Sequence, residues 1–274
     1  NGISEQNCVS RSKNKDVSIV TERPYQFPKP GTKALRRRPV IIGSGPAGLF
    51  CCYMLAQNGY RPILLERGKD VEARKKDVEA FWNGGPLNPE SNVSFGEGGA
   101  GTFSDGKLNT VIKDGSGRRT EVMRTFVEYG ADPSIMYINK PHVGTDVLSG
   151  IVRNMREDIK RLGGEVHFDS LFTGYDQITQ DEVCVHIKNL SDGSEKKYRT
   201  NALVLALGHS SRDTVEILYK KGVPMEPKPF AMGLRIEHKR ADIDVMKYGD
   251  DPAYAKLLPA ADYKMTHQAS NGRA

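Results

Sequence analysis

Apolar positions along the chain follow two periodicities, and their alternation predicts an α/β protein. Short uninterrupted apolar runs are typical of buried parallel strands and lie at residues 40–42, 63–65 and 202–207. A further strand is predicted at residues 166–172. Amphipathic segments with a helical period lie at residues 46–58, 70–82, 119–129 and 145–162. Because strands and helices alternate, the pattern predicts a parallel sheet covered by helices.

Some local signals refine these elements. Thr145 is expected to cap the helix that follows it. Within the helix at 70–82, Asp70 and Arg74 are spaced for a surface ion pair. Apolar residues at 183–187 and the segment 197–199 flank a Ser-Asp-Gly-Ser turn, which predicts a small antiparallel hairpin inserted into the α/β unit.

A glycine-rich turn joins the first strand to the first helix. Gly43-Ser44-Gly45-Pro46-Ala47-Gly48 fits the pattern G-x-G-x-x-G directly after the run at 40–42. In this pattern the glycines permit a tight exit from the strand, a close approach to a pyrophosphate and close packing of the helix on the sheet. Pro46 suits the first turn of a helix, whose N-terminus offers free N–H groups to phosphates.

The acidic residue expected of a dinucleotide-binding unit is also in place. Glu66 ends the second apolar run, 23 positions after Gly43. Its carboxylate can accept hydrogen bonds from the 2′- and 3′-hydroxyls of a ribose. Strand, glycine turn, helix, strand and acid together predict a Rossmann-like nucleotide site that includes Gly43, Gly45, Pro46, Ala47, Gly48 and Glu66.

A second glycine-rich stretch, residues 92–108, reads NVSFGEGGAGTFSDGKL. Its five glycines lie among hydroxyl-bearing residues, a composition that favours neither a strand nor a helix. Such a loop can bring its backbone very close to an anion, so we predict a second cofactor-contacting loop. A flexible surface loop is the alternative.

Charge is distributed unevenly along the 274 residues, whose formal net charge is +6. Residues 1–40 carry nine Lys/Arg and three Asp/Glu, so the whole excess lies there and the other residues balance. The triplet at 36–38 is its densest part. We interpret the segment as a solvated basic arm, and the balanced remainder argues against a nucleic-acid partner.

The four cysteines, Cys8, Cys51, Cys52 and Cys184, form no C-x-x-C pair. This usage is typical of a reducing compartment, and with no apolar leader at the start the expected location is cytoplasmic. No apolar run reaches membrane-spanning length, so no membrane association is predicted. No metal-ligand spacing occurs, so no metal is predicted either.

Several stretches are similar to one family of flavoproteins. SNVSFGEGGAGTFSDGKLNT (91–110), KPFAMGLRIEH (228–238) and ADYKMTHQASNGR (261–273) are the narrowest of them. On these and on the fingerprint, most of residues 22–274 resembles the predicted FAD-dependent dehydrogenases, also called NAD(FAD)-utilizing dehydrogenases, whose FAD domain is like that of glutathione reductase. In that class a later glycine-and-acid segment completes the FAD site, so the resemblance implies the N-terminal part of a longer protein.

The resemblance implies a domain plan and a cofactor site. The plan is a basic segment and linker at 1–38, a Rossmann-like FAD-binding domain with a parallel sheet and a small antiparallel insertion at 39–222, and the start of a substrate-side domain at 223–274. In the last, a strand is expected at 230–238 and irregular structure at 239–274. Beyond the fingerprint and Glu66, the implied FAD contacts are Arg67, Gly98, Gly99, Gly101, Ser104, Phe172 and Gly208.

Catalytic residues are left open, with Lys107, His142 and His238 as candidates. A positive group such as Lys107 near the flavin would stabilise its reduced form, and a histidine titrates near neutral pH. Each of the three also fits an ordinary surface or structural role.

The predicted function is an FAD-dependent oxidoreductase that transfers a hydride between flavin and an organic small molecule. With a single dinucleotide fingerprint, NAD(P)H as an external electron donor would dock directly at the flavin. The absence of a redox-active cysteine pair argues against a disulfide reductase. Two alternatives stay open, an FAD-dependent RNA-modifying enzyme that uses the basic segment, and a non-catalytic nucleotide-binding protein.

Overall fold

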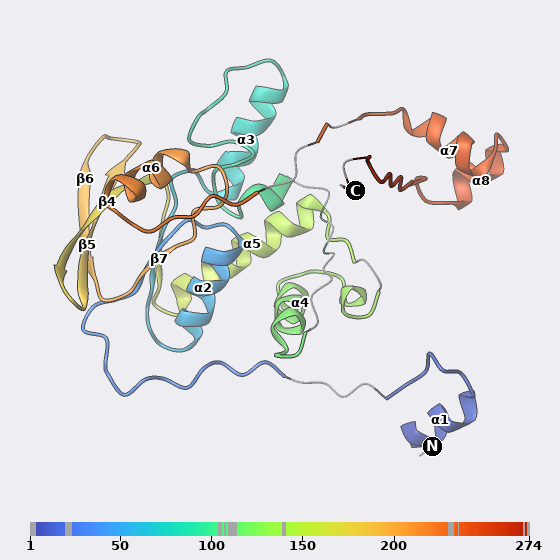
Figure 1. Cartoon of the computed structure of the whole chain (residues 1–274), viewed down its shortest axis with the longest axis horizontal. Coiled ribbons are helices and arrows are strands. Elements are labelled where there is room, and N and C mark those ends of the chain that lie inside the picture. Colours follow the sequence, from blue (N-terminus) through green and yellow to red (C-terminus); the bar gives the residue numbers. More distant parts are fainter. Residues whose placement is uncertain are drawn as a thin grey trace. The chain divides into compact units, whose positions relative to one another are not determined.

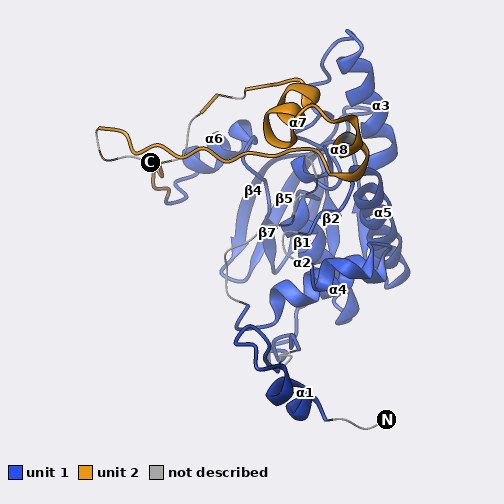
Figure 2. Ribbon diagram, turned by 90° about the vertical axis from the view of Figure 1, so that its right-hand side faces the viewer, with its two compact units in different colours: residues 1–224 blue, residues 225–274 orange. Residues whose placement is uncertain are grey.

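A computed structural model describes residues 4–19, 24–103, 106, 108, 114–138, 141–229, 233–234, 236–270 and 272. Two compact units, residues 1–224 and residues 225–274, make up the chain (Figure 2). The first unit contains the two glycine-rich stretches, namely the fingerprint and residues 92–108, and two β-sheets.

A four-stranded parallel sheet forms the centre of the first unit (Figure 1). Its strands, in the spatial order β3-β2-β1-β7, are β3 (Glu165–His167), β2 (Ile63–Leu65), β1 (Val40–Ile42) and β7 (Leu203–Leu205). Ile42 pairs with Leu65 on one side and with Leu205 on the other, so these strands end level with one another. The level ends place the turns that follow the strands along one edge of the sheet, and the predicted α/β class is confirmed.

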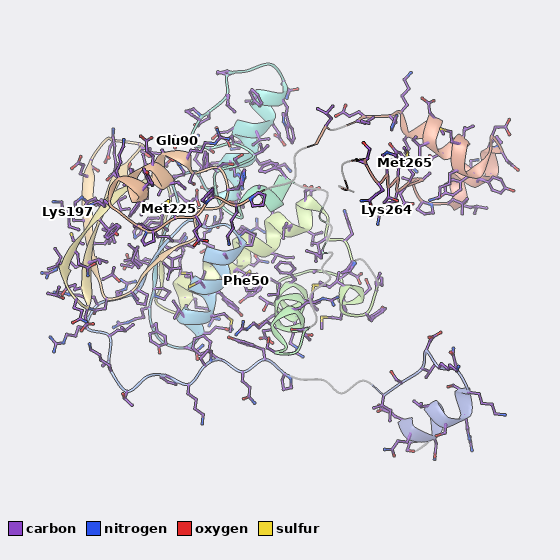
Figure 3. The ribbon with its side chains drawn as sticks, in the orientation of Figure 1. Phe50, Glu90, Lys197, Met225, Lys264 and Met265 are labelled. Atoms are coloured by element: carbon purple, nitrogen blue, oxygen red, sulfur yellow. The ribbon has the colours of Figure 1, made fainter. Side chains whose placement is uncertain are left out.

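Helices cover one face of this sheet. They are α2 (Pro46–Gln57), α4 (Arg118–Glu128) and α5 (Thr145–Arg161), and α3 (Val71–Trp82) packs beside α5. Short 3-10 turns, η1 (Ala100–Phe103) and η2 (Pro133–Met136), lie between these helices. Ile41 and Leu64 point into a core made mainly by α2, α4 and α5. Phe50 of α2 packs against Phe126 of α4, with ring centroids 5.8 Å apart (Figure 3).

An antiparallel sheet of three strands packs against the other face. It consists of β4 (Ser170–Thr179), β5 (Glu182–Asn189) and β6 (Glu195–Thr200), and helix α6 (Arg212–Lys220) packs beside β4. Ile42 and Leu65 share its core with Phe172 and Val185. The predicted hairpin is therefore part of a larger insertion. The single strand predicted at 166–172 is wrong, because the chain turns at Asp169, with φ 51°, to pass from the parallel sheet into the antiparallel one.

Two predictions, the N-cap of α5 and an ion pair in α3, are also wrong. The N-cap of α5 is Gly144, and Thr145 is the first helical residue. Asp70 does not pair with Arg74, because its carboxylate caps α3 by accepting a hydrogen bond from the N–H of Ala73 at 2.8 Å. A carboxylate just before a helix satisfies an N–H group that has no partner in the helix, and this contact holds its side chain at the end of α3.

The basic segment is attached to the first unit rather than fully solvated. The backbone N–H of Arg37 donates to the side chain of Asn201 at 2.8 Å. Arg38 donates to the carbonyl of Arg61 at 2.6 Å and forms an ion pair with Glu165. The interpretation as a solvated arm is therefore wrong for Arg38, whereas the side chain of Arg37 is exposed. Further upstream, α1 (Glu5–Ser12) is a helix that the sequence pattern did not indicate.

The described residues of the second unit include two short helices, α7 (Arg240–Tyr248) and α8 (Pro252–Leu257), where irregular structure was predicted. Asp251 caps α8 by accepting from the N–H of Ala253 at 2.9 Å, a local signal in the Asp-Pro sequence. The strand predicted at 230–238 falls partly outside the described residues, and residues 233–234 and 236–238 have no regular structure.

Candidate cofactor site

A cavity of about 290 Å³ opens at the carboxyl edge of the parallel sheet. Its walls come from the β1–α2 turn, the end of β2, the loop at 94–101, the start of β4 and the segment between β7 and α6. The predicted cofactor residues that line it are Gly43, Gly45, Pro46, Glu66, Arg67, Gly99, Gly101, Phe172 and Gly208.

The other predicted residues lie differently. Ala47 lines two hollows along α2 and β7 instead. Gly48 and Gly98 are buried beside the cavity without lining it, and Ser104 lies outside the described residues. His209, which was not among the predicted cofactor residues, also lines the cavity between Gly208 and Ser210.

The fingerprint turn requires its outer glycines. Gly43 has φ 97°, and a Cβ there would overlap the carbonyl oxygen of Ala206, the residue after β7. A Cβ on Gly48 would overlap the carbonyl oxygen of Gly43 and press on the side chain of Ala206. The turn can therefore close, and α2 can lie against the sheet, only without these side chains.

The second glycine-rich loop lies directly on the fingerprint turn. The N–H of Gly98 donates to the carbonyl of Ser44 at 3.0 Å. Gly99 has φ 65°, and a Cβ on it would lie 3.0 Å from Cα of Gly45. The two stretches that the sequence singled out are thus joined into one wall of the cavity, at the N-terminus of α2.

Glu66 ties this wall together, and its side chain is occupied by protein donors. The residue is 4% exposed. Oε2 accepts from both the N–H and the hydroxyl of Ser44 at 2.8 Å, and Oε1 accepts from the N–H of Gly68 at 2.9 Å and of Gly96 at 3.1 Å. A ribose hydroxyl could bind this carboxylate only in place of one of these donors, and the hydroxyl of Ser44 is the one free to rotate.

Arg67 lies beside the cavity as a fixed planar cation. Its guanidinium sits 4.3 Å from the centre of the Phe95 ring. It donates to both carboxylate oxygens of Asp213, at 3.0 and 2.7 Å, and to Glu90 at 2.8 Å. The hydrogen bond from Arg67 holds the pKa of Asp213 below its ordinary value. These contacts restrain α6 and the loop against the end of β2.

Arg74 is a site residue that sequence reasoning placed on the surface. It is 0% exposed and donates hydrogen bonds to carbonyl groups of the second glycine-rich loop. Burial lowers the pKa of its guanidinium to about 10, so it stays charged at neutral pH. A signal was present, because Arg74 shares the helical face of Val71 and Val78, three and seven residues along the helix from Val71.

A second buried charge, Glu97, lies behind the same loop. It is 1% exposed, and its Oε2 accepts from the N–H of Val71 at 2.8 Å and from Arg156 at 2.6 Å. Oε1 has no hydrogen-bond partner among the described residues. Burial raises the pKa of Glu97 to about 7 despite the guanidinium beside it. Arg156, on α5, links the loop to the helical layer.

The catalytic candidates are placed in three different ways. Lys107 lies outside the described residues. His142 is exposed and does not line the cavity. His238 belongs to the second unit, where its Nε2 lies 2.7 Å from the hydroxyl of Tyr263.

Among the described residues no group of three or more His, Cys, Asp or Glu side chains is arranged to hold a metal ion. In the same part of the chain, no helix has the length and apolarity to cross a membrane.

Family models match the chain in two consecutive parts. The model of the pyridine nucleotide-disulphide oxidoreductase family matches residues 37–230, and that of the FAD-dependent protein, C-terminal domain-like family matches residues 229–274. With the Rossmann-like fold and its glycine-lined cavity, these matches define the class as FAD-dependent proteins. Within that class, the chain belongs to the pyridine nucleotide-disulphide oxidoreductase family.

A curated relative that matches this chain is considerably longer than it. The chain is 48% identical over 267 residues to an uncharacterized protein of Clostridium beijerinckii. The match covers 97% of this chain and 48% of the relative. The chain therefore spans about half the length of that relative.

Solved structures match parts of the chain at low identity. Thermovibrio ammonificans THI4 matches with a TM-score of 0.44 and 18% identity, over 69% of this chain and 64% of that one. A flavoprotein/dehydrogenase from Cytophaga hutchinsonii matches with a TM-score of 0.43 and 12% identity, over 71% of this chain and 44% of that one. Lactococcus lactis thioredoxin reductase matches with 0.33 and 17%, over 62% and 35%. Likeness at this level carries no inference about activity.

Proposed function

We propose that the chain binds FAD through its adenosine diphosphate half and belongs to an enzyme that transfers a hydride between the flavin and an organic small molecule. One observation carries the proposal. Two glycine-rich stretches more than 40 residues apart in sequence meet at the N-terminus of α2, around a cavity at the carboxyl edge of a parallel sheet. That is the place where such sheets bind dinucleotides.

The residues present fit the pyrophosphate of FAD. Gly45 has open space beside its Cα apart from an ordinary contact with Gly99, so phosphate oxygens can approach the backbone there. Helix α2 directs its N-terminal partial positive charge at the same point. A cavity of about 290 Å³ is at the lower end of the size range of ligand sites, which suits part of a dinucleotide.

FAD, when bound, supplies the hydride chemistry. The chain's own residues would bind and orient its adenosine half. Phe172 and Gly208 wall the cavity on the side of β4 and β7, and Arg67 with Asp213 restrains the loop that borders it. NAD(P)H is proposed as the external electron donor, because the sequence has one dinucleotide fingerprint. The chain has no C-x-x-C pair, which argues for a substrate other than a disulfide.

The basic segment gives the RNA-modifying alternative little support. Arg37 lies 3.7 Å from Glu182, and Arg38 pairs with Glu165, so two of the three clustered arginines face carboxylates of the same chain. A phosphate backbone would have to compete with these contacts.

Competition between cofactors tests the proposal. Equilibrium dialysis of the purified 274-residue chain with FAD, ADP and FMN measures each affinity and each pairwise competition. We expect FAD and ADP to compete for one site, and FMN, which lacks the adenosine half, to bind at least tenfold more weakly. FMN binding as tight as that of FAD, with no competition from ADP, would refute the assignment of the cavity. FAD binding without reduction by NADH or NADPH would favour the non-catalytic alternative.

A further inference from the structure

We propose that Arg74 is a positioning residue that turns the carbonyl groups of the loop at 92–99 away from the cavity and so makes this loop a wall that phosphates can approach. The inference rests on the proposed function, because it concerns the same cavity. It assigns a role in ligand binding to a side chain that does not itself reach the cavity.

Arg74 donates to five backbone carbonyl groups of one loop. Nε binds the carbonyl oxygen of Asn92 at 2.8 Å, and Nη2 that of Val93 at 3.1 Å. Nη1 is shared among the carbonyl oxygens of Gly96 at 3.3 Å, Glu97 at 2.6 Å and Gly99 at 2.9 Å. One fully buried guanidinium therefore gathers carbonyl groups from both ends of the loop.

The direction of these carbonyl groups decides what the other side of the loop offers. Gly96 and Gly99 line the cavity, while their carbonyl oxygens point at Arg74. An oxygen lone pair facing the cavity would repel a phosphate, and Arg74 withdraws these lone pairs from the wall. The guanidinium stays charged at neutral pH, because burial lowers its pKa only to about 10. This positive charge lies behind the wall in a region of low dielectric constant.

The packing around Arg74 excludes looser arrangements. Gly96 has φ 119°, and a Cβ on it would overlap Cδ of Arg74, so the loop lies directly on the stem of the side chain. Beyond the stem, the guanidinium sits 4.8 Å from the centre of the Phe103 ring, in η1. Phe103 in turn meets Trp82 edge-on at 6.1 Å, and Trp82 is the only tryptophan of the chain.

Gly96 is held from two sides by opposite charges. Its N–H donates to Glu66 at 3.1 Å, and its carbonyl accepts from Arg74 at 3.3 Å. The same peptide segment is thus fixed between the acid that ends β2 and the arginine of α3. A lysine could not replace Arg74, because an ammonium is a compact donor group without the planar fork that reaches several carbonyls at once.

The first test compares Arg74→Lys with Arg153→Lys in the full 274-residue chain. Both changes keep the charge, and Arg153 is an exposed arginine on α5. Equilibrium dialysis gives the affinity for ADP and for adenosine. We expect Arg74→Lys to weaken ADP binding at least tenfold and adenosine binding less than twofold, with Arg153→Lys unchanged. Equal losses for ADP and adenosine, or no loss for ADP, would overturn the positioning role.

A second measurement needs neither a ligand nor a folded variant. In the ligand-free wild-type chain, ¹⁵N NMR exchange should show the side-chain Nε–H of Arg74 exchanging at least a hundredfold more slowly than that of Arg153. Equal rates would mean that the loop is not clamped, and would overturn the inference even if FAD binds. Slow exchange at Arg74 in a chain that binds neither FAD nor ADP would instead refute the proposed function, while showing that Arg74 holds the loop.

Discussion

Glu66→Gln tests the conclusion that this side chain holds the site together before any cofactor binds. The substitution keeps the size of the side chain and replaces one carboxylate oxygen by an amide group. In the wild-type chain four donors from Ser44, Gly68 and Gly96 share the two oxygens. A glutamine can accept from two of them, and its NH2 group must face the other two.

The cost follows from which donors the amide faces. If the NH2 group faces Ser44, it can donate a hydrogen bond to the rotated hydroxyl. The buried N–H of Ser44 is then left unpaired, at a cost of about 1–3 kcal/mol. The remaining contacts lose their charge assistance, which adds on the order of 1 kcal/mol. We therefore expect the free energy of unfolding to fall by about 2–4 kcal/mol, a large part of the roughly 5–15 kcal/mol typical of a domain.

Urea unfolding of the cofactor-free chain measures this loss. Ser44→Ala is the matched control, because it removes only the hydroxyl donor and should cost about 1 kcal/mol. It also frees one acceptor position on Glu66, so FAD affinity should not fall with stability in this variant. A Glu66→Gln chain that unfolds within about 0.5 kcal/mol of wild type would refute the reasoning, and the acid would then act on the ribose alone.

Three further predictions concern buried groups. Because burial raises the pKa of Glu97 to about 7 from 4.5, the folded chain keeps a proton that the unfolded chain releases. Stability should therefore fall by about 3 kcal/mol from pH 4.5 to 7, and Glu97→Gln should remove that slope in unfolding titrations. Gly48→Ala should cost more than about 3 kcal/mol in urea unfolding, whereas Gly150→Ala, in a helix with open space, should stabilise by about 0.5–1 kcal/mol. Burial raises the pKa of Cys52 to about 12, so mass spectrometry after iodoacetamide at pH 8 should find Cys8 labelled and Cys52 unlabelled.

The core of the fold was predictable because its signals are local. The apolar runs at 40–42 and 63–65 and the glycines between them predict strand, turn, helix and strand without knowledge of any distant contact. What the pattern could not show is that Gly99 packs on Gly45, because that contact depends on how the intervening helix α3 returns the chain to the sheet.

The charged residues of the site were harder to predict. Spacing alone pairs Arg74 with Asp70, and only the tertiary contact with the loop shows that the arginine is buried. Glu97 and Arg156 are 59 positions apart and meet through the packing of α5 on the loop. A charged side chain can be buried when a partner far away in the sequence compensates the cost of its desolvation. Such a partner leaves no pattern in the local sequence.

The central claim is that the glycine-lined cavity binds FAD, and the visible absorption spectrum of the purified chain tests it most directly. The spectrum is recorded before and after FAD is added and the sample desalted. We expect a flavin spectrum that stays with the protein and that excess ADP displaces. A colourless protein that takes up no FAD, and to which ADP does not bind either, would contradict the account.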